Sequence, residues 1–142
     1  MESKNGGQLL IVEDGDEDFD VLRLALRDAG VTNELVRCAD GDEALAYLAR
    51  KDARPALILL DLNLPGLDGR EVLRELRASA SLRTIPVMVL STSNSPRDVE
   101  LCYREGANCY AVKPIGLDKL ERLVRLIKEF WLEAMELPGV HR

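Results

Sequence analysis

Histidine is almost absent from this chain of 142 residues, and the only one, His141, is the penultimate residue. This scarcity argues against Ser-His or Cys-His catalysis, histidine-ligated metals and phosphohistidine carriage. Cysteine is also scarce, and the three present (Cys38, Cys102 and Cys109) include no C-x-x-C pair. A disulfide framework or a cysteine zinc site is therefore not expected, and reduced thiols of a cytoplasmic protein are the default interpretation.

Long hydrophobic runs and an excess of positive charge are missing as well. The longest apolar run is Ala56–Leu60, far short of the roughly 20 residues that span a bilayer. No basic-then-apolar leader is visible, so we expect a cytoplasmic protein without membrane attachment. Asp and Glu number 25 against 19 Lys and Arg, a net charge of −6. Direct nucleic-acid binding is not expected, because it usually needs a basic face.

The chain alternates strand and helix signals across a length typical of one domain, which we expect to comprise residues 1–142. Helices are expected between successive strands, with a long last helix from Leu117 to about Met135. Short apolar segments predict five strands, at residues 8–12, 34–38, 56–60, 86–90 and 108–112. Five β-α units of this size predict an α/β fold, a doubly wound parallel five-stranded sheet with helices on both faces.

Polar residues follow four of the predicted strands, namely Glu13-Asp14, Asp61, Ser91-Thr92 and Lys113-Pro114. Right-handed crossovers bring the carboxyl ends of parallel strands to one edge, where such sheets bind ligands. Three converging carboxylates would repel one another. Lys113 and a divalent cation would neutralise them, and an all-oxygen donor set suits Mg²⁺ or Mn²⁺.

An anionic pocket with a lysine and a divalent cation suits phosphoryl transfer. Because histidine and reactive cysteine are lacking, the nucleophile is predicted to be a carboxylate. Asp61 is the best candidate, since it follows the central strand, and the hydroxyl of Ser91 is placed to donate to a phosphoryl oxygen. Thr92 is the alternative to Ser91.

Several motifs together resemble the receiver domain of two-component response regulators, a flavodoxin/CheY-like (βα)5 domain. The resemblance covers about residues 8–130, with the last helix extended to about 136. It is carried by Ile11-Val12-Glu13-Asp14, the run from Leu60 to Gly69, Val89-Leu90-Ser91-Thr92 and Tyr110-Ala111-Val112-Lys113-Pro114.

The resemblance implies a role for each of these positions. Asp61 would be the phosphoacceptor, and Asp14 a direct Mg²⁺ ligand. Glu13 would act through a metal-bound water and Asn63 through its backbone carbonyl. The remaining implied roles are a phosphoryl-binding Lys113, a cis peptide bond before Pro114, a switch hydroxyl at Ser91 and a switch aromatic at Tyr110.

By the same resemblance, the chain is a stand-alone response regulator of a phosphorelay and not an enzyme acting on other substrates. A sensor histidine kinase would donate the phosphoryl group. Movement of Ser91 and Tyr110 would then alter the surface formed by the fourth helix, the fifth strand and the fifth helix. Tyr110 has the alternative interpretation of a plain packing residue.

The last helix carries more apolar residues than one sheet can cover. One stripe, expected to face the sheet, contains Leu117, Leu120, Val124, Ile127 and Trp131. A second stripe contains Leu123, Leu126, Phe130 and Leu137. A helix packed on one sheet needs an apolar arc of only about 100°. A homodimer through Leu123, Leu126 and Phe130 is therefore expected, with a generously buried terminal helix as the alternative.

Two local features narrow the resemblance to response regulators of phytochrome-type histidine kinases: Phe130-Trp131-Leu132-Glu133 and Asn108-Cys109-Tyr110. Two other classes of protein fit the sequence less well. A phosphohydrolase with an aspartyl-phosphate intermediate usually has a second acid two residues after the nucleophile, where this chain has Asn63. A phosphorylation-independent interaction module does not need the complete set of acids, serine and lysine.

Overall fold

The computed structural model describes residues 6–138, so His141 lies outside the described residues. Strands and helices alternate along the chain as expected. In order they are β1 (Gln8–Val12), α1 (Asp16–Asp28), β2 (Leu35–Cys38), α2 (Gly41–Leu48), β3 (Pro55–Leu60), α3 (Gly69–Ala78), β4 (Val87–Ser91), α4 (Pro96–Arg104), β5 (Cys109–Val112), α5 (Leu117–Ile127) and a π-helical segment η1 (Lys128–Ala134).

The five strands form one parallel sheet in the order β2-β1-β3-β4-β5. From β1 the chain adds β2 on one side and then crosses back to add β3, β4 and β5 on the other side. This is the doubly wound topology predicted from the sequence. The register of the strand pairs aligns the carboxyl ends of the strands, since Val12 lies opposite Leu60 and Ser91 lies opposite Val112. The carboxyl ends of β1, β3, β4 and β5 therefore share one edge.

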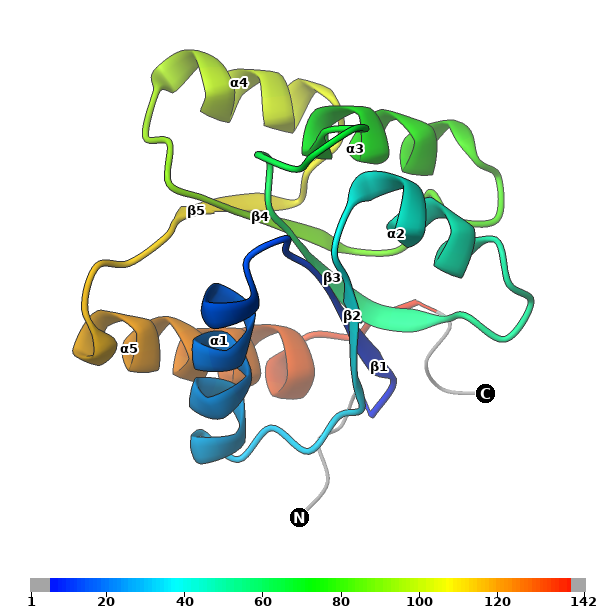
Figure 1. Cartoon of the computed structure of the whole chain (residues 1–142). Coiled ribbons are helices and arrows are strands. Elements are labelled where there is room, and N and C mark those ends of the chain that lie inside the picture. The colour runs from blue at the N-terminus through cyan, green and yellow to red at the C-terminus, as the bar shows by residue number, and fades with distance from the viewer. Residues whose placement is uncertain (1–5, 139–142) are drawn as a thin grey trace.

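Helices cover both faces of the sheet (Figure 1): α1 and α5 lie on one face, and α2, α3 and α4 lie on the other. Side chains of β3 alternate between the faces, with Leu57 and Leu59 toward α1 and α5, and Ile58 and Leu60 toward α2–α4. Every residue of β3 is buried, as expected for a central parallel strand. This packing fixes the edge at which the functional groups meet.

Element ends differ from the predictions by one or two residues. The second and fifth strands begin one residue later than expected, at Leu35 and Cys109. The fourth strand runs from Val87 to Ser91, because Pro86 has no N–H to pair with a neighbouring strand. Asp40 is the N-cap of α2, since its carboxylate accepts a hydrogen bond from the Glu43 amide at 2.8 Å.

The last helix departs from the predicted regular α-helix. It widens into a π-helix at Lys128, and the Met135 amide donates to the Phe130 carbonyl, an i→i+5 bond. The extra residue per turn brings Leu132 into the core, whereas Trp131, expected there, is only partly buried. Leu117, also expected to face the sheet, is 60% exposed. Among residues 6–138, this helix and the others all lack the length and apolar character needed to cross a membrane.

Candidate functional site at the carboxyl edge of the sheet

Backbone hydrogen bonds hold the ends of the strands together. The Asp61 amide donates to the Val12 carbonyl at 3.0 Å, which places Asp61 beside Glu13. The Lys113 amide donates to the Ser91 carbonyl at 2.7 Å, which joins the ends of β4 and β5. Residues far apart in sequence thus leave the sheet side by side, as the topology predicted.

Three carboxylates converge at this edge. One oxygen from each of Glu13, Asp14 and Asp61 lies within 4.8 Å of the others. Glu13 and Asp61 are buried, with 6% and 7% exposure, whereas Asp14 is exposed. A cluster of hard oxygen donors, open to solvent on the Asp14 side, fits Mg²⁺ or Mn²⁺ better than zinc or copper.

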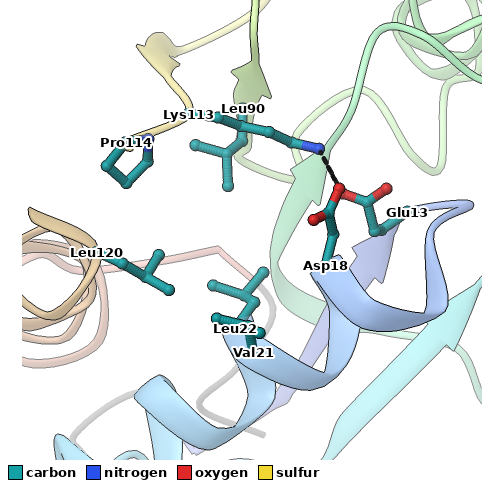
Figure 2. Close-up of a pocket in the computed structure, with 8 residues that line it drawn as sticks. All are labelled: Glu13, Asp18, Val21, Leu22, Leu90, Lys113, Pro114 and Leu120. Carbon is teal, nitrogen blue, oxygen red and sulfur yellow. Dashed lines mark hydrogen bonds and ion pairs between the residues drawn. The ribbon is translucent and has the colours of Figure 1, made fainter. Parts of the chain in front are cut away.

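Lys113 lies between the two buried acids. Its Nζ donates to Glu13 Oε1 at 2.6 Å and to Asp61 Oδ2 at 3.0 Å. Asp18, in the first turn of α1, has a carboxylate oxygen 3.7 Å from the same Nζ (Figure 2). Burial disfavours the charged ammonium, but the hydrogen bonds to Glu13 and Asp61 outweigh it and raise the pKa of Lys113 to about 12. Burial raises the pKa of Glu13, and Lys113 opposes that shift.

The lysine is approached from solvent through a small pocket of about 130 Å³. The Lys113 side chain crosses the upper side of this pocket in Figure 2. Apolar side chains of α1, β4 and α5 line the rest of it, namely Val21, Leu22, Leu90 and Leu120. A partly apolar wall strengthens the charge interactions of the ammonium at its end.

The phosphoacceptor candidate Asp61 has a fixed orientation. Its Oδ1 accepts a hydrogen bond from the Asn63 amide at 3.1 Å, and its Oδ2 faces Lys113. Gly69 packs against the same turn so closely that a Cβ there would lie 2.4 Å from the Asp61 carbonyl oxygen. Glycine is therefore required at the start of α3, because the backbone there lies too close to the backbone of Asp61 to leave room for a side chain.

Ser91 and Tyr110 are connected through Ser93. The Ser93 amide donates to Ser91 Oγ at 3.2 Å, and the Tyr110 hydroxyl donates to the Ser93 carbonyl at 2.8 Å. Ser91 is fully buried at the end of β4, whereas the alternative Thr92 is exposed. Tyr110 is already partly buried against the core beneath α2–α4. The geometry therefore favours Ser91 over Thr92 as the hydroxyl of this site.

The predicted cis peptide bond before Pro114 is wrong, because residues 6–138 contain no cis peptide bond. The trans form is the lower-energy state of an X–Pro bond by about 0.5–1 kcal/mol. Lys113 reaches both carboxylates with this bond in the trans form.

Two contributors were missed from the sequence. Asp18 was not among the predicted site residues, although its position one turn after Asp14 could have signalled a place near the site. Arg37 was not singled out, yet its guanidinium donates to the Glu13 carbonyl oxygen at 3.1 Å. Nothing in the local sequence of β2 indicates that contact.

Comparison with known proteins identifies this arrangement. A family model described as the response regulator receiver domain matches residues 9–125. The chain belongs to the response regulator receiver domain family. The flavodoxin/CheY-like (βα)5 fold implied by the resemblance of the motifs is thereby confirmed.

The receiver is similar along most of its length to known response regulators. It is 41% identical to the response regulator Rcp1 of Synechocystis sp., over 92% of both chains. The crystal structure of the Mn²⁺-bound form of Rcp1 matches with a TM-score of 0.85, covering 93% of this chain and 99% of that one. The phosphorylated cyanobacterial phytochrome response regulator RcpA matches with a TM-score of 0.88 and 41% identity, covering 98% and 100%.

Proposed function

We propose that this receiver accepts a phosphoryl group on Asp61 from a phosphohistidine of a sensor histidine kinase, in a reaction that depends on Mg²⁺. The observation that carries the proposal is the position of Lys113 Nζ, which contacts both Glu13 and Asp61 inside a trio of carboxylates. This arrangement neutralises a negatively charged phosphoryl group where Asp61 can reach it.

The reaction exchanges one bond to phosphorus for another. An oxygen of Asp61 attacks the phosphorus in line, the O–P bond forms, and the P–N bond to the kinase imidazole breaks with its electron pair going to nitrogen. Lys113 leaves its contact with the Asp61 carboxylate and pairs with a phosphoryl oxygen. Glu13 keeps the ammonium at the site during this exchange, because its carboxylate is held by the Gly15 amide at 3.0 Å.

Glu13, Asp14, Asp61 and the Asn63 carbonyl would hold the cation, with Mn²⁺ able to replace Mg²⁺. The bound cation stabilises charge on the phosphoryl oxygens. Rcp1, whose Mn²⁺-bound form has a solved structure, supports this assignment. We further propose that the chemistry of the receiver is confined to its own acyl phosphate. Asn63 stands where phosphohydrolases have a second acid, and a neutral amide cannot exchange a proton as an acid does.

Phosphorylation would be transmitted by the hydrogen bonds that link Ser91, Ser93 and Tyr110. When Ser91 Oγ turns to a phosphoryl oxygen, it stops accepting from the Ser93 amide. The β4–α4 loop then loses one restraint, and the Ser93 carbonyl that holds the Tyr110 hydroxyl shifts with it. The surface of α4, β5 and α5 changes as a result.

The proposed partner is a phytochrome-type kinase, supported by the likeness to the phytochrome response regulator RcpA. The experiment is transfer of labelled phosphate from autophosphorylated kinases to the receiver within seconds to minutes. Transfer from a phytochrome kinase faster than from an unrelated histidine kinase supports the partner. Absence of transfer from every histidine kinase tested, with or without Mg²⁺, would contradict the proposal.

We also propose that two copies associate through α5. Leu126 and Phe130 are about half exposed, and Phe130 packs edge-to-face on Trp131 beside a groove of about 270 Å³. Leu123, the third predicted contact, is half-buried and lines that groove. Exposed arginines in the middle and the last turn of α5 would pair with exposed glutamates in η1 between two antiparallel helices. The residues are Arg122, Arg125, Glu129 and Glu133.

The dimer is tested by Leu126→Glu, which places a charge in the proposed contact. We expect the mass measured by multi-angle light scattering to fall from dimer to monomer at micromolar concentration. Leu24→Glu is the matched control, because Leu24 is exposed to 52% on α1 and Leu126 to 51% on α5. A monomeric mass for the unmodified protein, whether phosphorylated or not, would contradict the proposal.

A further inference from the structure

The segment between β1 and α1, which carries Glu13 and Asp14, is held by a side chain from outside the acidic cluster. Arg37 lies on β2, the edge strand beside β1, and pairs in register with Ile11. Its Nε donates to the Glu13 carbonyl at 3.1 Å, and its NH1 lies 2.7 Å from Asp16 Oδ1. One guanidinium therefore contacts residues on both sides of Asp14 and Gly15.

A third contact fixes the plane of this guanidinium. Its Cζ lies 5.0 Å from the centre of the Phe19 ring, within the range of a cation–π contact. Phe19 is itself partly buried against the core beneath α1 and α5. A planar, forked group can make all three contacts at once, whereas a lysine ammonium cannot.

Stability alone is a weak explanation for this arrangement. Asp16 is 87% exposed, so its ion pair with Arg37 contributes little. The remaining NH2 of Arg37 is buried and has no hydrogen-bond partner among residues 6–138. A buried donor left without a partner destabilises the folded state. A positive charge beside a cation site also repels the cation, so the benefit must lie in geometry.

We propose that Arg37 is a positioning residue for the divalent cation. It restrains the segment from Glu13 to Asp16, and so holds the Asp14 carboxylate in place before the cation arrives. The inference rests on the cation site of the proposed function. Pre-ordered ligands bind more tightly because less conformational entropy is lost on binding. Residues behind metal ligands commonly alter affinity by roughly 10–100-fold.

A purely electrostatic role and a positioning role of Arg37 predict different effects of its substitution on cation affinity. If Arg37 acted only through its charge, Arg37→Gln would tighten cation binding and Arg37→Lys would leave it unchanged. If it positions the segment, both variants weaken binding. We expect the Mn²⁺ dissociation constant, measured from the free Mn²⁺ signal in electron paramagnetic resonance, to rise about tenfold in each variant.

Arg23→Gln is the control, because it also removes one positive charge, from an α1 side chain that pairs with Asp20 at 3.6 Å. We expect its Mn²⁺ affinity to stay within about twofold of wild type. In the metal-free protein, hydrogen exchange over residues 13–20 should be faster in both Arg37 variants and unchanged in Arg23→Gln. Phe19→Leu, which keeps the charge and removes the ring, should weaken Mn²⁺ binding in the same direction if an Arg37 variant does not fold.

Tighter or unchanged Mn²⁺ binding in Arg37→Gln, or unaltered exchange over residues 13–20, would overturn the positioning role. Absence of Mn²⁺ binding by the wild-type protein would instead overturn the cation site of the proposed function. The two failures are therefore distinguished by the wild-type titration.

Discussion

Asp61→Asn is expected to abolish labelling of the receiver by acetyl phosphate in the presence of Mg²⁺. An amide is not a nucleophile toward phosphorus, and Glu13, the other buried acid of the cluster, is bound by Lys113 and the Gly15 amide. The measurement is the intact mass after incubation, with hydroxylamine treatment to cleave an acyl phosphate. We expect labelling of the variant to fall to background.

Loss of folding would not explain this result. Removing one of three converging carboxylates relieves repulsion, so Asp61→Asn should be at least as stable as wild type in the absence of a cation. Asp68→Asn is the matched control, since Asp68 lies after the same strand and caps α3 by accepting from the amides of Arg70 and Glu71. Asparagine caps a helix about equally well. Full labelling of Asp61→Asn would contradict the assignment of the phosphoacceptor.

The arrangement of the strands could be predicted from the sequence because the physical signals are local. The run from Ala56 to Leu60 is apolar on both faces, which only a covered parallel strand requires. Once the strands are parallel, their carboxyl ends must share an edge, and the meeting of Asp61 with Lys113 follows without further information.

Features that depend on side chains crossing between elements could not be predicted in this way. The contact of Arg37 with the Glu13 carbonyl needs the register of β1 and β2 and a particular rotamer. The π-helical turn after Ile127 is set by packing of Leu132 into the core, whereas a regular helical repeat had placed Trp131 there. In both cases tertiary contacts override the local pattern.

Lys113→Met is expected to have the second large effect, on stability as well as on phosphorylation. It leaves Glu13 and Asp61 buried beside each other without a compensating cation. Breaking a buried pair costs roughly 3–5 kcal/mol, and the partial exposure of this site reduces the figure to about 2–3 kcal/mol. Phosphorylation by acetyl phosphate should slow at least ~100-fold, because the charge on the phosphoryl oxygens loses one preorganised donor.

The loss of stability should be partly reversed by Mg²⁺. Removal of one positive charge makes the acidic cluster a stronger binder of a dication, and binding to the folded state alone raises the free energy of unfolding. Urea unfolding in chelator and in excess Mg²⁺ measures this difference. Lys119→Met is the control, since Lys119 is an exposed lysine of α5. Equal destabilisation of the two variants in chelator would contradict the role assigned to Lys113.

The pH dependence of the difference between wild type and Lys113→Met has a definite sign. The pKa of Lys113 is raised from 10.5 to about 12, so the stability it provides is fully present below pH 10.5 and is lost as the pH rises to about 12. That shift corresponds to about 2 kcal/mol. At low pH the group that matters is Glu13. Burial raises the pKa of Glu13 and Lys113 lowers it, so the pKa of Glu13 rises further when Lys113 is replaced by Met.

An acid with a raised pKa in the folded state destabilises the protein as the pH rises through that value, because the folded form then binds more protons than the unfolded chain. Lys113→Met should consequently lie closest to wild type near pH 5 and furthest from it between about pH 7 and pH 10. Urea unfolding in chelator across this range tests the expectation. A difference that is constant from pH 5 to pH 10 would show that Lys113 does not compensate the buried carboxylates.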